Sequence, residues 1–321
     1  MSGMLITLGV KCHNQRRTVG AAIEAAFGQT YRPLEIVVSD DGSTDGSWEL
    51  IRELCRGREE PGLKVVLNRN PVNLGNMGNW LRICELSHGE WIVKADGDDI
   101  SESSRVERIA ECVCDTRPEV YVVSSGCRKI DGEGRVCGQV KTRSAWYPLG
   151  AVMAFHRRCY TDFPVPSDGR NVDDEVFARR ALILGDGREA RIDEPLVRYR
   201  VGSGISSAVD DIRESELRCM RLKPRTFGQL RRDLEALTKT GLLKDEAERR
   251  KWLEVLARQE REVADEIELR SAPTFARRLR AWRRHPARCP FRPYGIKLLV
   301  YLLPRRTGDA VLRLLTRIRY R

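Results

Sequence analysis

The chain has 321 residues, enough for one large α/β domain with an appendage or for two modest domains. Its net charge of +11 is concentrated at one end, because residues 271–321 hold fourteen Lys and Arg against the single acid Asp309, a net of +13 that leaves 11 − 13 = −2 for residues 1–270. The ten cysteines lack paired spacing, which argues against a disulfide framework and for reduced cytosolic thiols, and neither a signal peptide nor a membrane span of roughly 18 apolar residues is predicted.

The first 125 residues alternate between strand-like and helix-like patterns. Short apolar runs of the kind that parallel sheets bury on both faces are separated by segments with apolar residues at helical spacing. This order predicts an α/β fold with a doubly wound, mostly parallel sheet and helices on both faces. The expected strands are 5–10, 34–38, 63–67, 91–95 and 121–123.

Polar side chains follow each of the first four expected strands. Ligands of doubly wound sheets lie beyond the carboxyl ends of the strands, so these loops predict a binding cleft. Each loop alone can also be an ordinary turn or helix cap, as Ser43 and Asp45 could be for a helix starting near Trp48. The loops are 11–14, 39–45, 68–75 and 96–99.

Three acids, Asp96, Asp98 and Asp99, crowd the end of the fourth strand. Their mutual repulsion favours neutralisation by a hard divalent cation or a cationic partner. An Asp-Gly turn before the next helix is the alternative, since both residues are common in turns. The sequence has neither G-x-G-x-x-G after the first strand nor a P-loop, so a nucleotide here would be held by acids and a metal.

An ordered series of motifs resembles the inverting family 2 glycosyltransferases of bacterial polysaccharide synthesis, which have the GT-A fold and use nucleotide diphosphate sugars. The resemblance covers residues 4–205 and predicts a domain at 1–207 followed by a helical extension at 208–321. The motifs are 9–14 (GVKCHN), 29–36 (QTYRPLEI), 38–45 (VSDDGSTD), 73–75 (NLG), 78–80 (GNW), 89–92 (GEWI), 96–99 (DGDD), 105–108 (RVER), 130–134 (IDGEG), 173–181 (DDEVFARRA) and 194–200 (EPLVRYR).

The resemblance implies roles for individual residues. Asp40 would lie against the donor's base, a uracil-type ring, and Asp96 and Asp98 would match the D-x-D acids that reach the ribose and a diphosphate-bound Mg²⁺ or Mn²⁺. Asp99 is either a supporting acid or a helix cap. The residues expected to bind the donor are Lys11, Asn14, Asp40, Asp41, Asn73, Asn79 and Asp96, and the metal ligands are Asp96 and Asp98.

Asp174 matches the family's general base, which takes a proton from the acceptor hydroxyl. The residues alone favour a role for Asp173, Asp174 and Glu175 as first-turn acids of a helix, and only the family resemblance reverses that preference. Two departures stand out: Asp173 occupies a place where Glu is commoner, and Gly202 one where many members carry His, which puts a metal or diphosphate contact there in question. The Gly- and Ser-rich segment 202–207 is expected to form a lid.

The tail carries a basic amphipathic pattern, with Leu312, Leu315 and Ile318 on one face and arginines on the other. This pattern favours association with anionic lipid. Docking onto the chain's own domain is the next alternative and nucleic acid the last, so no nucleic-acid partner is expected.

The predicted function is sugar transfer from a nucleotide diphosphate donor, UDP-sugar first, to a lipid-linked or polymeric glycan, by a cytoplasmic enzyme on the inner face of the cell membrane. The alternatives are a polyprenyl-phosphate sugar transferase or a non-catalytic protein that binds nucleotide, glycan or nucleic acid.

Overall fold

The computed structural model describes residues 3–115, 119–142, 144–146, 148–166, 172–202, 212–243, 245–286, 298–305, 307–309 and 311–312. The chain divides into two compact units, Met1–Val201 and Gly202–Arg321. The predicted boundary at residue 207, most of the predicted lid at 202–207 and the last residues of the basic tail lie outside the described residues, so these expectations stay predictions.

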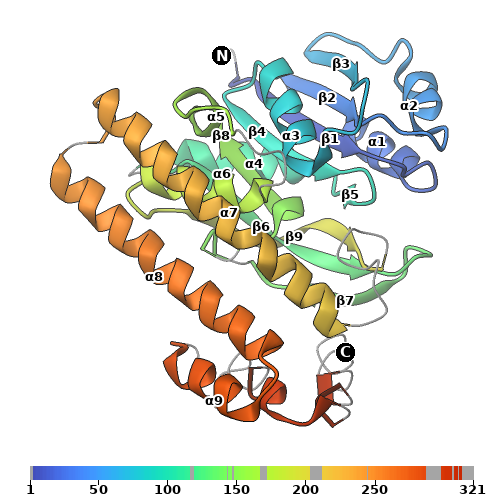
Figure 1. Cartoon of the computed structure of the whole chain (residues 1–321). Coiled ribbons are helices and arrows are strands. Elements are labelled where there is room, and N and C mark those ends of the chain that lie inside the picture. Colours follow the sequence, from blue (N-terminus) through green and yellow to red (C-terminus); the bar gives the residue numbers. More distant parts are fainter. Residues whose placement is uncertain are drawn as a thin grey trace. The chain divides into compact units, whose positions relative to one another are not determined.

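The first unit is built on one twisted sheet (Figure 1) with the strand order β3-β2-β1-β4-β8-β6-β9-β5, in which β7 also pairs with β6. The first four strands are parallel, whereas β8 runs antiparallel to both β4 and β6. The mostly parallel α/β sheet predicted from the sequence is thereby confirmed. The strands are β1 (Ile6–Cys12), β2 (Leu34–Asp40), β3 (Leu63–Arg69), β4 (Trp91–Asp96), β5 (Ile100–Ser101), β6 (Val122–Ile130), β7 (Val136–Val140), β8 (Met153–His156) and β9 (Ala190–Arg200).

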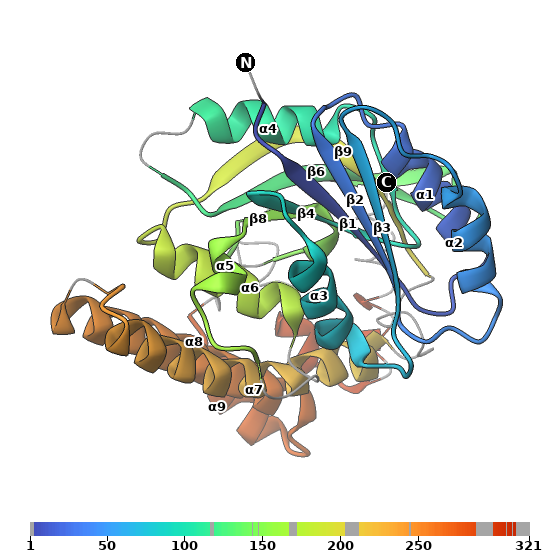
Figure 2. The same cartoon turned by 90° about the horizontal axis from the view of Figure 1, so that it is seen from above.

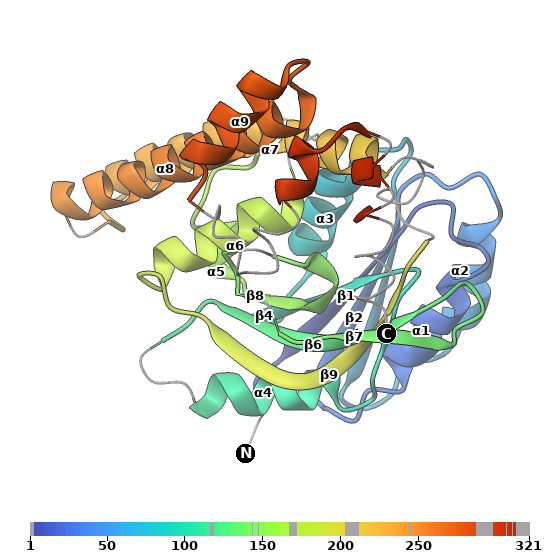
Figure 3. The same cartoon turned by 90° about the horizontal axis from the view of Figure 1, so that it is seen from below.

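Helices cover both faces of this sheet. Seen from above and from below (Figures 2 and 3), α1 and α4 lie on one face and α3 and α6 on the other. Apolar side chains of α1, α2 and α4 pack on β1 and β2 in one core. The helices of this unit are α1 (Val19–Phe27), α2 (Ser47–Cys55), α3 (Gly75–Leu86), α4 (Arg105–Asp115), α5 (Arg158–Thr161) and α6 (Asp173–Leu184), with a short 3-10 turn, η1 (Gly150–Val152).

The second face holds an aromatic cluster between α3, β8 and α6. The rings of Trp80 and Phe177 meet edge to face with centroids 5.7 Å apart, and Phe155 lies 6.3 Å from Trp80. A glycine in β1 permits this close packing, because a Cβ on Gly9 would overlap the side chain of Ile83 in α3. Helices α3 and α6 are therefore fixed against the strands that carry the polar loops.

The second unit is helical, as expected. Helix α7 (Ile212–Lys239) packs along α8 (Glu246–Ser271), and α9 (Phe275–Arg284) and the 3-10 turn η3 (Val300–Leu302) follow. Some apolar residues of the tail pack within this unit: Leu298, Tyr301 and Leu312 are buried against residues of α8 and α9. Among the described residues, no helix is long and apolar enough to cross a membrane.

Candidate active site

The carboxyl ends of four parallel strands bring the polar loops together. Lys11 of β1 lies beside Asp96 of β4 and beside Ser39 of β2, and Asp40 of β2 lies beside Arg69 of β3. Because parallel neighbours end at the same edge of a sheet, residues from distant parts of the chain share one rim. The cleft-forming loops predicted from the sequence occupy this rim.

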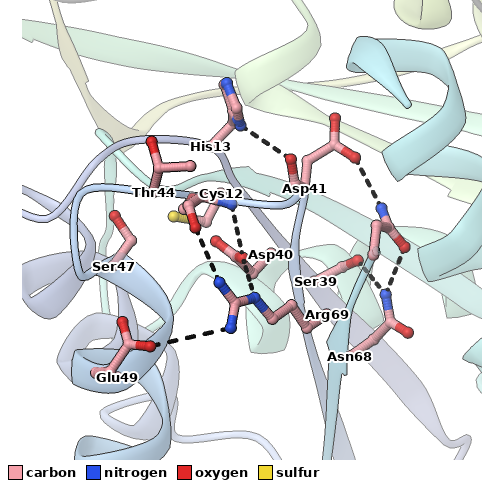
Figure 4. A network of polar contacts seen from close by, with 12 residues as sticks. Cys12, His13, Ser39, Asp40, Asp41, Thr44, Ser47, Glu49, Asn68 and Arg69 are labelled. Atoms are coloured by element: carbon pink, nitrogen blue, oxygen red, sulfur yellow. Dashed lines mark hydrogen bonds and ion pairs between the residues drawn. The ribbon is translucent and has the colours of Figure 1, made fainter. Parts of the chain in front are cut away.

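Asp40 is a fully buried carboxylate, and one of its two oxygens accepts no hydrogen bond from the described residues (Figure 4). Its Oδ2 accepts a hydrogen bond of 3.0 Å from the backbone N–H of Ser43 and lies 3.7 Å from Nε of Arg69. Its Oδ1 has no hydrogen-bond partner among the described residues. A buried acceptor without a donor is costly, so this oxygen suits an N–H brought by a ligand.

Asp41 is occupied by the protein itself. Its carboxylate accepts hydrogen bonds of 2.9 Å from the backbone N–H groups of Leu74 and Gly75 and one of 2.8 Å from Asn70 Nδ2. Gly75 is the first residue of α3, so Asp41 satisfies donors that a helix N-terminus otherwise leaves open. Asp41 thus fixes the start of α3 against the end of β2.

Asn79 ties α3 to two strands from inside the protein. Its Oδ1 accepts a 2.6 Å hydrogen bond from Ser39 Oγ, and its Nδ2 donates to the carbonyl oxygens of Ser39 at 3.1 Å and Cys12 at 3.4 Å. With only 3 % of its side chain exposed, Asn79 supports the floor of the rim.

Asn14 and Asn73 lie at the exposed rim, where His13 joins them. His13 Nδ1 donates to the carbonyl of Asp41 at 3.0 Å, which leaves Nε2 to accept from Asn73 Nδ2 at 2.9 Å and Asn14 Nδ2 at 3.3 Å. Asn14 also has the left-handed φ of 52° and accepts a hydrogen bond from the N–H of Thr44 at 2.9 Å. Three loops therefore form one polar ridge.

Two lysines and two acids form a cluster where β1, β4 and α6 meet. Lys11 Nζ lies 3.2 Å from Asp96 Oδ1 and 3.0 Å from Asp173 Oδ2, and Lys94 Nζ lies 2.7 Å from the same Asp173 oxygen. Burial raises the pKa of Asp96 and Asp173, but the two ammonium groups outweigh it and hold both pKa values below the usual range. Both acids are thus carboxylates at neutral pH.

Asp174 differs from its neighbour Asp173. Burial raises its pKa, nearby Asp173 and Glu175 add to the rise, and Lys94 opposes it. Its Oδ2 accepts a 3.0 Å hydrogen bond from the backbone N–H of Gly150. Two adjacent acids with opposite pKa shifts are typical of sites that move protons, with Asp174 the better proton acceptor.

Asp98 and Asp99 are attached to the end of β9. Asp99 Oδ1 accepts a 2.7 Å hydrogen bond from the N–H of Arg200, and Arg200 Nε donates to the carbonyl of Asp98 at 3.0 Å. Asp99 Oδ2 is buried without a hydrogen-bond partner in the part of the chain that the structure describes, and burial raises its pKa well above the usual range. Asp99 therefore joins the turn after β4 to β9.

Asp96 and Asp98 are the two metal ligands that the sequence predicts. Carboxylate oxygens suit Mg²⁺ or Mn²⁺, and Asp96 and Asp98 are half-buried at the rim. Within the described ranges, however, no three His, Cys, Asp or Glu side chains gather as a metal site. A cation held here would need further oxygens from a bound ligand such as a diphosphate.

The sequence reasoning missed Lys94, Asn76 and Gly150. Asn76 accepts a 2.5 Å hydrogen bond from Lys11 and donates to Asp173 Oδ1 at 3.0 Å. Lys94 could have been found, because a lysine within an apolar strand requires a buried acid. No comparable signal marks Gly150, whose role depends on the tertiary packing.

The sheet order and its acidic carboxyl edge define a GT-A-type α/β fold. Residues 7–168, half of the chain, match glycosyl transferase family 2. The chain belongs to this family, which confirms the resemblance found in its sequence.

Curated relatives share parts of the chain. An Escherichia coli UDP-Glc:alpha-D-GlcNAc-diphosphoundecaprenol beta-1,3-glucosyltransferase, WfaP, is 26% identical over 32% of this chain and 38% of its own length. The putative glycosyltransferase EpsE of Bacillus subtilis is 30% identical over 33% of this chain and 37% of its own length. The chain therefore spans less than half the length of these relatives.

Solved structures of similar fold include S. aureus TarS 1-349 in complex with UDP-GlcNAc, with a TM-score of 0.54 and 15% identity over 97% of this chain and 90% of that one. Another is the mannosyltransferase PcManGT from Pyrobaculum calidifontis with GDP-Man and Mn²⁺, with a TM-score of 0.52 and 18% identity over 97% of this chain and 87% of that one. At these identities the likeness is one of fold.

Proposed function

We propose that the protein is an inverting glycosyltransferase that moves a sugar from a nucleotide diphosphate donor, UDP-sugar in the first instance, to a hydroxyl of a lipid-linked or polymeric glycan. The observation that supports the proposal is that, in a family 2 chain, Asp40 and Asp96 end the two strands on either side of β1, and Asp173, the neighbour of Asp174, pairs with Lys11 of β1. Their different surroundings suit them to different roles.

The donor would be held by groups along the rim. Asp40 Oδ1, which has no donor among the described residues, would accept a hydrogen bond from the ring N–H of a uracil-type base. Lys11, Asn14 and Asn73 would contact the same donor. Asp41 and Asn79 would act by fixing the loops, since their side chains already bond to protein groups.

Asp96 and Asp98 would hold Mg²⁺ or Mn²⁺ together with the diphosphate. When bound, such a cation offsets the charge that develops on the departing nucleoside diphosphate. Two carboxylates would leave most positions around such a cation for diphosphate oxygens and water.

Asp174 would act as the general base. As the acceptor oxygen attacks the anomeric carbon from the face opposite the diphosphate, its proton passes to the Asp174 carboxylate, a C–O bond forms, and the bond to the diphosphate oxygen breaks. Attack from that face inverts the anomeric configuration. The raised pKa of Asp174 favours proton uptake from the acceptor hydroxyl.

The acceptor would be presented at the cytoplasmic face of a membrane. WfaP is named for a diphosphoundecaprenol-linked acceptor, and α9 carries exposed arginines, including Arg280 and Arg283, that suit anionic headgroups. Sedimentation with anionic and neutral vesicles tests this membrane association, and we expect binding to the anionic vesicles alone. Binding to both kinds of vesicle, or to neither, would contradict it.

Ligand-induced stabilisation tests the donor. We expect UDP-sugars with Mn²⁺ to raise the thermal midpoint of the wild type, because a ligand that binds only the folded state stabilises it. An Asp98→Ala variant should lose the manganese-dependent part of this shift, and the wild type should release nucleoside diphosphate when an acceptor is present. Binding without release would favour a non-catalytic binding protein.

A further inference from the structure

Lys94 is a buried cation in the middle of an apolar strand. Only 3 % of its side chain is exposed, and its strand neighbours Val93 and Ala95 are buried apolar residues. A buried ammonium is costly unless an acid pairs with it closely. Asp173 provides this partner, with its Oδ2 at 2.7 Å from Lys94 Nζ.

Asp173 connects Lys94 to the start of α6. It is the first residue of that helix, its side chain is fully buried, and Asp174 follows it directly. The same carboxylate accepts hydrogen bonds from Lys11 and Asn76, both at 3.0 Å. The first turn of α6 is thus joined to β4, β1 and α3 through one side chain.

Gly150 closes the other side of this arrangement. A Cβ on Gly150 would overlap Nζ of Lys94 and would lie 3.1 Å from both Cβ and Oδ2 of Asp174. Lys94, Gly150 and Asp174 are therefore packed without spare room, and the position of the ammonium group limits where the Asp174 carboxylate can lie.

We propose that Lys94 is a positioning residue for sugar transfer: by holding Asp173, it fixes the first turn of α6 and so the place of the Asp174 carboxylate. The inference rests on the proposed function in one respect, the assignment of Asp174 as base. The ionisable groups that act on Asp174 are Lys94 of β4, Lys11 of β1, and Asp173 and Glu175 of α6.

Hydrogen exchange tests the positioning without any need for turnover. Lys94→Met keeps most of the side-chain volume and removes the charge. The amides of Val176, Phe177 and Ala178 should then lose protection by about tenfold, because the turn is free to open locally. In wild type the Val176 N–H donates to the carbonyl of Val172 at 3.1 Å.

Glu35→Gln is the matched control, since Glu35 is equally buried in a polar network but lies at the amino end of β2. This variant should change α6 protection no more than protection elsewhere in the sheet. Equal loss at α6 in both variants would overturn the proposal. Should Lys94→Met not fold, the charge-balanced Lys94→Met/Asp173→Asn variant replaces it with the same expectation.

Kinetics test the consequence for transfer. A base displaced by about 1 Å costs about 10²-fold in rate, so Lys94→Met should lower kcat by about that factor and change the donor KM by less than about threefold. The acid limb of the kcat profile should move to higher pH, because the cation that lowers the pKa of Asp174 is lost. Unchanged kcat and pH profile would refute the inference, whereas a wild type that transfers no sugar would refute the proposed function and leave the exchange result to decide the positioning.

Discussion

Glu35 at the amino edge of the sheet differs from Asp40 and Asp99 at the carboxyl edge in how far the protein satisfies the carboxylate oxygens. At the amino edge, Glu35 Oε2 accepts hydrogen bonds from Thr7 Oγ1 at 2.8 Å and from the N–H of His88 at 2.7 Å, while Oε1 lies 2.8 Å from His88 Nδ1 and 3.3 Å from Lys64. At the carboxyl edge, Asp40 and Asp99 each keep one buried oxygen without a hydrogen-bond partner among the described residues. An acid with both oxygens bonded stabilises the fold, whereas a buried oxygen without a donor lacks a partner that a ligand N–H would supply.

This difference predicts that acids at the carboxyl edge affect turnover and the acid at the amino edge affects stability. The largest expected effect is that of Asp174→Asn, which keeps the shape of the side chain and removes the proton acceptor. We expect kcat for transfer to fall by about 10³-fold, with the donor dissociation constant within about threefold of wild type. Single-turnover transfer and calorimetric donor binding measure the two quantities, and transfer at the wild-type rate would contradict the base assignment.

Asp40→Ala should weaken donor binding. Losing a hydrogen bond to a charged group costs about 1.5–3 kcal/mol, so uridine diphosphate should bind about 10- to 150-fold more weakly. Pyrophosphate provides the control ligand, because it lacks the base that Asp40 is proposed to contact and should bind both proteins alike. Equal losses for the two ligands would mean that the change disturbs the whole rim.

Glu35→Gln should act on stability at the opposite edge. The variant leaves buried donors without the carboxylate that they bond to, so the free energy of unfolding should fall by about 2 kcal/mol near neutral pH. The value of kcat should stay unchanged. Urea unfolding and steady-state kinetics on the same preparations check this. A loss of activity at full stability would break the comparison between the edges.

The difference in stability between wild type and Glu35→Gln should depend on pH through the pKa of Glu35. Burial raises this pKa, but the hydrogen bonds from His88, Thr7 and Lys64 outweigh burial and hold it below the usual 4.5. The stabilisation is therefore complete above pH 4.5 and is lost as the pH falls through the lower folded-state value. The gap in stability between wild type and Glu35→Gln should narrow over this acidic range, and a constant gap would contradict the linkage.

The smallest effect is expected on the surface. Arg82 and Glu85 form an exposed pair within α3, and exposed pairs of this kind contribute little in water. Glu85→Gln should leave both the unfolding midpoint and kcat unchanged. This result would show that the effects predicted above belong to the buried acids and do not follow from replacing any acid.

The sequence by itself determined the first four strands and the place of the acids that follow them. Short apolar runs ending in Asp40 and Asp96 have to place these residues near the ends of strands, because strand periodicity and the position of a polar stop are local properties. The ordered motifs also singled out Asp174, although a simple role as a first-turn acid of a helix could not be separated from a role as base.

Only the tertiary structure decided how each acid is used. Asp41 bonds to the start of α3, Asp99 bonds to Arg200 at the end of β9, and Lys94 of β4 pairs with Asp173 at the start of α6. These partners are far apart in the chain, so no local pattern relates them. Whether a buried carboxylate is satisfied or open depends on which donors the folded chain brings within hydrogen-bond distance, and that is a property of packing.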